Sequence, residues 1–157
     1  MKKLLLFFIV AMVVMACSEG DKPTPKPYNN LTDSIGTVTQ QPAWVATNVE
    51  LLNPSVAQIV VVTQSELPVP VKEEDLIGAF VGGECRAVAK PVVEPNGKIA
   101  FTLTILGKDD ADDDGKDVEL RYYSKNNSRI YIAQPFAFIA GERLGDLNNS
   151  GYKVVLR

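Results

Sequence analysis

The segment Asp75–Lys90, which reads DLIGAFVGGECRAVAK, constrains the fold of this chain more than any other part of the sequence. Two short runs with β propensity flank Gly82-Gly83, and a Gly-Gly pair between such runs is a strong signal for a two-residue hairpin turn. Pairing the two arms without interruption places Ala79 opposite Arg86. The segment is therefore predicted to be a regular β-hairpin.

Side chains alternate between the two faces of a hairpin, so this pairing assigns every residue to a face. One predicted face is wholly apolar and consists of Leu76, Gly78, Phe80, Cys85, Ala87 and Ala89. The other is wetter and contains Ile77, Ala79, Val81 and Val88 together with Asp75, Glu84, Arg86 and Lys90. Because the residues around Phe80 are mostly small, the apolar face needs a bulky neighbour, and Trp44 is predicted to cover it from the opposite sheet or its edge. The alternative is an exposed Trp44 that serves as a ligand platform.

Short β-prone segments separated by turn residues follow Trp44. Ser55–Gln64 is rich in Val and Ile and is predicted to be a central, buried strand, and Ile99–Ile105 shows the clearest alternation of apolar and polar residues. Further strands are predicted at Val118–Tyr123, Ile130–Ala133, Phe136–Ile139 and Tyr152–Leu156. With scarcely any helical periodicity, this pattern predicts an all-β fold, a single antiparallel β-sandwich of Ig-like or jelly-roll-like type.

Residues 1–16 are organised like a lipoprotein signal peptide. Lys2 and Lys3 precede a short apolar core, and the Val14-Met15-Ala16-Cys17 sequence that closes it resembles the lipobox of bacterial lipoproteins. By this resemblance Cys17 becomes the lipidated N-terminus of the mature protein, held at a membrane by its acyl chains. The alternative is an ordinary secretory signal in which Cys17 has no such role.

The residues after Cys17 indicate a location and a spacer. Ser18 resembles the residue that sends lipoproteins to the outer membrane, and Glu19 and Asp21 resemble an acidic signal for export to the cell surface. The predicted location is the outer membrane, on its periplasmic side or at the cell surface. The proline-rich composition of residues 17–43 predicts a disordered linker before a β-sandwich domain at residues 44–157. Within the linker, Asp33-Ser34-Ile35 resembles a bacterial O-glycosylation sequon, so Ser34 is a candidate acceptor; a plain linker residue is the alternative.

Composition excludes some functions. The formal net charge is −3, and it becomes more negative once Lys2 and Lys3 are removed. An acidic chain without a basic cluster is a poor match for nucleic acid. The chain contains no histidine and only two cysteines, so Cys85 has neither an activating base nor, once Cys17 is lipidated, a disulfide partner within the chain. Cys85 is therefore predicted to be a small buried apolar residue, with a reactive thiol as the alternative.

The acidic segment Gly107–Asp117 carries candidate metal ligands. The candidate calcium ligands are Asp110, Asp112, Asp114, Asp117 and Glu119. The D-x-D-x-D-G pattern is typical of calcium loops, because alternate carboxylates around a glycine turn can converge on one ion. Arg121 occupies the place of the EF-hand glutamate, so a site here would be of another type. The alternative is a solvated acidic turn that limits aggregation.

The segment Asp75–Ala89 and the later runs FTLTILG and VELRYYS resemble β-sandwich domains of secreted and surface proteins from Gram-negative bacteria. Those domains carry a motif similar to D-x-I-G-A-F-V-G-x-E-C-R-G. This chain departs from the motif with Ala87 in place of the last glycine, and its acidic segment is unusual. The resemblance implies the fold and an envelope setting, and no assigned activity.

These observations predict a lipid-anchored, non-enzymatic binding or adhesion module for a glycan or an envelope protein, with calcium as the one candidate cofactor. A structural accessory subunit of an outer-membrane complex is the alternative, and a hydrolase with a carboxylate pair is a third hypothesis. Glu84 and Arg86 are predicted to form an exposed ion pair of little energetic value. A candidate aromatic surface, with ordinary core and rim positions as the alternative, comprises Arg121, Tyr122, Tyr123, Arg129 and Tyr131. The ligand-binding residues remain unassigned by sequence.

Overall fold

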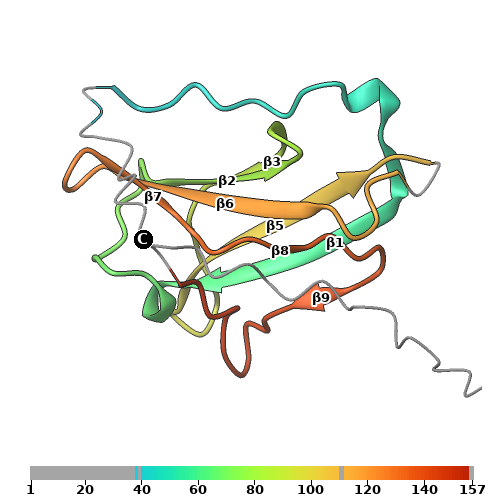
Figure 1. Ribbon diagram of the computed structural model, residues 1–157. Helices are drawn as coiled ribbons and strands as arrows, with labels where there is room; N and C mark the ends of the chain where they lie inside the picture. The colour runs from blue at the N-terminus through green and yellow to red at the C-terminus, as the bar shows by residue number, and fades with distance from the viewer. Residues whose placement is uncertain (1–37, 39, 110–111, 156–157) are drawn as a thin grey trace, which may run out of the picture. The chain divides into compact units, whose positions relative to one another are not determined.

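The computed structural model describes residues 38, 40–109 and 112–155, which form two β-sheets packed face to face (Figure 1). Sheet A contains, in spatial order, β4 (Val92–Val93), β5 (Ile99–Gly107), β1 (Asn53–Thr63) and β9 (Arg143–Leu144). Sheet B contains β3 (Glu84–Ala89), β2 (Leu76–Val81), β6 (Asp117–Ser124) and β7 (Arg129–Ile132), and β8 (Phe136–Ala137) also pairs with β6. The predicted all-β sandwich is confirmed.

Helical structure in the described residues is limited to two short 3₁₀ turns, η1 (Val49–Leu51) and η2 (Gln64–Glu66). Over the same residues, no helix has the length and apolar character needed to cross a membrane.

Strand β1 is the centre of sheet A, as its Val- and Ile-rich sequence predicts. It pairs antiparallel with β5 on one side and parallel with β9 on the other. Its second half is fully buried at Val60, Val61 and Val62. Since a strand paired on both sides and buried on both faces meets little water, β-branched residues suit every position.

The predicted last strand, Tyr152–Leu156, is wrong over the described residues 152–155, which join no ladder. Isolated backbone hydrogen bonds hold this segment instead. The Tyr152 N–H donates to the Val61 carbonyl at 2.6 Å, and the Gln134 N–H donates to the Val155 carbonyl at 3.0 Å. The segment has a composition typical of a β-strand. Its backbone bonds first to Val61 in β1 and then to Gln134 between β7 and β8, so it extends along no single strand.

The main core lies between the two sheets. Phe101 of β5 and Tyr122 of β6 meet edge to face with ring centroids 6.1 Å apart, and Phe138 is completely buried in the same core near Gly107, at the other end of β5. The hairpin contributes its inward side chains to this core: Ile77, Ala79, Val81, Ala87 and Ala89.

The β2–β3 hairpin differs from its predicted register by one residue. Phe80 pairs with Cys85 next to the turn as expected, but Ala79 then pairs with Ala87, so Arg86 is an extra residue in β3. Such a bulge breaks the alternation of side chains and re-aims the extra one. Gly82 and Gly83 both have positive φ, 57° and 86°, as a two-residue hairpin turn requires.

The bulge corrects the predicted faces. Ala87 and Ala89 join Ile77 and Ala79 in the main core, so the face predicted to be wetter is the inner face. Val88 moves to the outer face, where it packs with Leu76 and Trp44. Both faces of the hairpin are therefore apolar.

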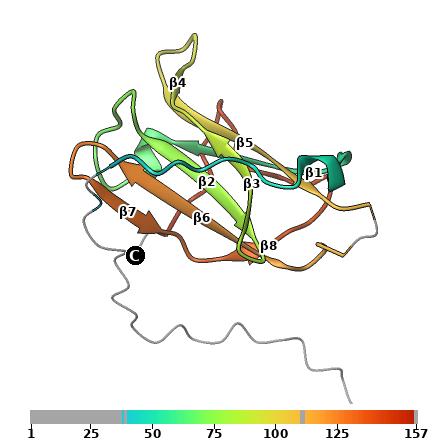
Figure 2. The same ribbon diagram turned by 90° about the horizontal axis from the view of Figure 1, so that it is seen from above.

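An extended N-terminal segment, residues 40–47, covers the outer face of sheet B; we call it the strap (Figures 1 and 2). Its side chains alternate, with Pro42, Trp44 and Ala46 half-buried and their neighbours exposed. At its far end the Thr47 N–H donates to the Cys85 carbonyl at 2.9 Å. Just before the strap, the Val38 N–H donates to the Ser128 carbonyl oxygen at 2.8 Å. The packed chain thus begins before Trp44.

Trp44 packs on the apolar face around Phe80, as predicted, although it arrives on the strap and not from the opposite sheet. The two rings meet edge to face with centroids 5.7 Å apart. Gly78 provides the seat, because a Cβ there would lie 3.0 Å from Trp44 Cε3 and 2.9 Å from Phe80 Cε2. The Arg121 guanidinium also packs on Phe80, 4.0 Å from the centroid of its ring.

Asp75, predicted to be on the wetter face, is fully buried at the start of the hairpin. Its carboxylate accepts hydrogen bonds from the Tyr122 hydroxyl at 2.6 Å and from the N–H groups of Lys72 and Lys125 at 2.9 and 2.7 Å. Burial, and then the bond to Asp75, raise the pKa of Tyr122 well above its usual value. The carboxylate therefore joins two chain segments that are distant in sequence, residues 72–75 and residues 122–125.

The Trp44 seat can be tested by a double-mutant cycle. Gly78→Ala should destabilise the protein by about 1–3 kcal/mol, because the added methyl group is overpacked against Trp44 and Phe80. Trp44→Ala should cost about 2 kcal/mol, less than a fully buried tryptophan because Trp44 is only half-buried. In the Trp44→Ala background, Gly78→Ala should cost about 1 kcal/mol less, measured by urea unfolding. Strictly additive effects would show that Gly78 and Trp44 do not share one packing site.

Candidate functional site

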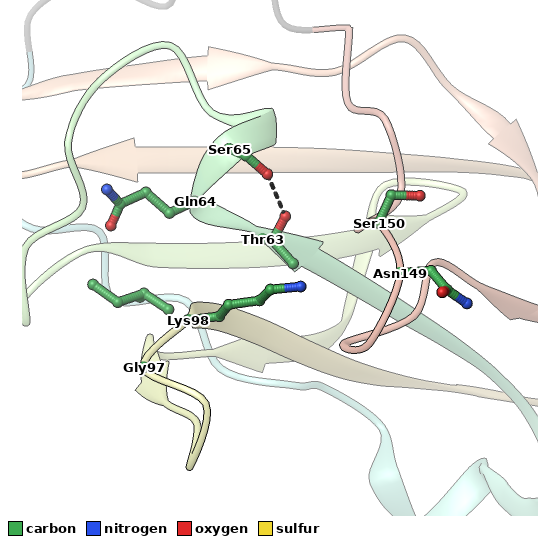
Figure 3. A pocket seen from close by; sticks show the side chains of 8 residues that line it. Thr63, Gln64, Ser65, Gly97, Lys98, Asn149 and Ser150 are labelled. Carbon is green, nitrogen blue, oxygen red and sulfur yellow. Dashed lines mark hydrogen bonds between the residues drawn. The ribbon is translucent and has the colours of Figure 1, made fainter.

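A polar cleft of about 530 Å³ lies at the end of sheet A where β1 finishes and β5 begins (Figure 3). Three segments line it: the end of β1 with η2, the turn before β5, and the loop after β9. The lining residues are Thr63, Gln64, Ser65, Gly97, Lys98, Ile99, Asn149 and Ser150. All but Thr63 and Ile99 are exposed, so the polar groups are open to solvent.

Two glycines fix the loop after β9 against β1. Gly145 has a φ of +80°, and a Cβ there would lie 2.5 Å from the Val61 carbonyl oxygen. A Cβ on Gly151 would lie 2.6 Å from the backbone nitrogen of Thr63. Because only glycine permits these approaches, the loop seats directly on the strand.

Backbone hydrogen bonds close the same loop on itself. The Asp146 N–H donates to the Ser150 carbonyl at 2.8 Å, and the Asn148 N–H donates to the Asp146 carboxylate at 2.7 Å. These two hydrogen bonds brace the wall that carries Asn149 and Ser150.

Lys98 connects two walls of the cleft. Its ammonium donates to the backbone carbonyls of Leu147 and Asn148 at 3.3 and 3.5 Å. The backbone N–H of Lys98 donates to the side-chain oxygen of Asn96 at 2.9 Å. Gly97 lies between them in this turn and has a φ of +78°. Figure 3 shows the lysine side chain passing Thr63 toward the side where Asn149 and Ser150 lie.

Hydroxyl and amide groups supply the rest of the cleft. Thr63 Oγ1 and Ser65 Oγ are hydrogen-bonded at 2.8 Å, which orients both hydroxyls. The side chains of Gln64, Asn149 and Ser150 are exposed. Such groups both donate and accept, so the cleft suits a ligand rich in hydroxyl groups.

The acidic segment is organised by a residue that the calcium pattern omits. Asp113 is 1% exposed, and its carboxylate forms an ion pair with Arg86 at 3.0 Å. It also accepts the Lys108 N–H at 3.1 Å and pairs with Lys116 at 3.3 Å. Arg86 is itself 3% exposed and pairs with Glu84 at 2.9 Å. The predicted Glu84–Arg86 pair thus exists, but Arg86 is buried because the bulge turns it away from solvent.

The described calcium candidates are dispersed. Asp112 pairs with Lys116 at 3.1 Å, and that hydrogen bond lowers the pKa of Asp112. Asp114 and Asp117 are exposed, and Glu119 pairs with Arg121 at 2.6 Å. Across residues 40–109 and 112–155, no three acidic or cysteine side chains converge as metal ligands would. Calcium binding stays a prediction, which a rise in melting temperature with millimolar Ca²⁺, reversed by chelator, would support.

Two tyrosines of the predicted aromatic surface, and Cys85, are buried and pack within the fold. Tyr122 and Tyr123 are 1% exposed, so the candidate aromatic surface does not include them. Tyr131 is half-buried against Tyr122, with Arg129 over its outer side at 5.6 Å. Cys85 is buried, and burial raises the pKa of its thiol, as expected for an unreactive cysteine.

Cys17, Ser34 and Asp110 lie outside the described residues. The cleft residues were not predicted as a site, because they come from three segments distant in sequence and match no motif. Two of the three segments carry a local turn or loop signal, Asn96-Gly97 and the Gly- and Asn-containing stretch 141–151, and neither signal indicates a site. The fold and site define a β-sandwich with a polar cleft; comparison with protein families, curated proteins and solved structures finds no match to this chain.

The role of Asp113 can be tested against its neighbour. Asp113→Asn should lower the free energy of unfolding by about 3 kcal/mol, because it leaves the buried Arg86 without its main counter-charge. Asp112→Asn is the matched control, and it should change the urea midpoint little because exposed ion pairs contribute little. Equal effects of the two substitutions would contradict a special role for the buried carboxylate.

Proposed function

We propose that this protein is a non-enzymatic binding module that holds a glycan in the polar cleft at Thr63, Lys98, Asn149 and Ser150. The observation that carries the proposal is the cleft itself, a concave surface in which six of the eight lining residues carry a hydrogen-bonding side chain. Saccharides present many hydroxyl groups, each able to donate and accept, and the cleft residues offer the same capacity.

The fixed geometry of the cleft supports binding. The glycine contacts at Gly145 and Gly151 and the Lys98 bridge order the walls in the free protein. A ligand therefore does not have to order the loop, and that entropic cost is absent from its binding free energy. Solvent-exposed amide groups at Gln64 and Asn149 can adjust to a ligand without moving the backbone.

Glycan binding can be tested with the complete chain in detergent on a glycan array. Asn149→Ala should weaken any glycan signal about fivefold or more, because it removes both an amide donor and an acceptor from the cleft. Asn126→Ala is the matched control, since Asn126 begins the same Asn-Asn-Ser tripeptide in the exposed turn between β6 and β7. Equal loss in both variants, or no bound glycan, would contradict the proposal.

We also propose that the protein acts while anchored in the outer membrane through Cys17. The support is the order of basic residues, apolar run and Cys17 in the sequence. Tethering of many copies on one surface would add avidity to a weak individual site. An accessory subunit of a membrane complex is the alternative, and a stable partner that co-purifies with the cleft variants would favour it.

The anchor predicts a clear change in fractionation. Cys17→Ala should move the protein out of the detergent-soluble membrane fraction and abolish incorporation of labelled palmitate, because no acceptor thiol for the lipid remains. Cys85→Ala is the control and should retain both label and membrane fraction. Label that persists in Cys17→Ala would contradict lipidation at this residue.

A further inference from the structure

We propose that the cleft selects saccharides with a single anionic group, a sugar acid such as a uronic acid, through the Lys98 ammonium. This inference rests on the proposed function and adds the chemical class of its ligand. Lys98 is the one charged residue among those that line the cleft, and every other lining side chain is neutral. The cleft therefore has a local positive charge on an acidic protein.

The partners of Lys98 differ from those of Lys116 and Arg86. Both of those cations pair with carboxylates at 2.9–3.3 Å. Within the described part of the chain, Lys98 forms no ion pair, and its two contacts are longer hydrogen bonds to uncharged carbonyl oxygens. Those carbonyls hold the ammonium in place but leave its charge uncompensated. An anionic group on the ligand would supply the missing counter-charge.

The position of the charge also limits the ligand. The oriented hydroxyls of Thr63 and Ser65 lie in the same cleft as Lys98, so a sugar ring could place hydroxyl groups there and its carboxylate at the ammonium. One ammonium can neutralise one anionic group. The formal charge of −3 on the whole chain repels a ligand that carries many. The geometry therefore favours a singly charged saccharide over a densely sulfated one.

The test compares matched probes by calorimetry on the full chain in detergent. A uronic-acid disaccharide should bind about tenfold more tightly than the neutral hexose disaccharide in which hydroxymethyl replaces the carboxylate, a difference of about 1.4 kcal/mol. High salt should reduce that preference, because mobile ions screen an exposed charge pair. A hexose-6-phosphate arm distinguishes a carboxylate from a phosphate as the preferred anion.

Variants separate charge from shape. Lys98→Gln should remove the preference for the acidic disaccharide over the neutral one, whatever its effect on the affinity for both, and Lys98→Arg should retain the preference. Lys125→Gln, in the β6–β7 turn, is the control and should leave all affinities unchanged. Equal binding of acidic and neutral probes with no effect of Lys98→Gln overturns this inference and leaves glycan binding standing. No binding of any saccharide overturns both.

Discussion

The bulge at Arg86 is the local feature on which the rest of this sandwich depends. By adding one residue to β3, it turns a long cation into the interior, where Arg86 meets the buried carboxylate of Asp113. The same shift sends Ala87 and Ala89 into the main core and Val88 to the outer face. A buried ion pair gains little net stability, because desolvation offsets the attraction, but a partner left alone is costly. Through its ion pair with Asp113, Arg86 therefore fixes the position at which the acidic segment contacts the sandwich.

Because the bulge leaves both faces of the hairpin apolar, sheet B needs a cover on its outer side. The strap supplies it, and Trp44 fills the space that Gly78 leaves beside Phe80. The strap also satisfies part of the free edge of β3, where the Thr47 N–H donates to the Cys85 carbonyl. An exposed edge strand with apolar side chains is a site of aggregation, so covering it protects the fold.

Local sequence signals predicted the hairpin turn, the central β1 strand and the partner of Phe80, because each depends on neighbouring residues or on one unusual side chain. The sequence did not reveal the bulge. Counting the alternation from the turn assumes that every residue is paired, and no local signal marks Arg86 as the extra residue that brings Ala87 onto the same face as Ile77. The error placed Asp75 and Arg86 at the surface, although both are buried and hydrogen-bonded.

The cleft was beyond sequence analysis for a different reason. Its walls come from the end of β1, the turn before β5 and the loop after β9, so the site exists only once sheet A is assembled. The glycines that set its shape, Gly145 and Gly151, have no motif around them, and their importance appears only when the contacts with Val61 and Thr63 are known.

The strap and the cleft contact different sheets and share no residue. The hydrogen bonds of the strap lead to Cys85 and Glu74 in and before the sheet B hairpin, whereas the cleft is built on β1 and β5. Since the walls of the cleft are held by their own glycine contacts and by Lys98, a ligand can enter without displacement of the strap. The Trp44 seat and the proposed binding cleft are therefore separate parts of this sandwich, and substitutions in the Trp44 seat should change stability without altering the chemistry of the cleft.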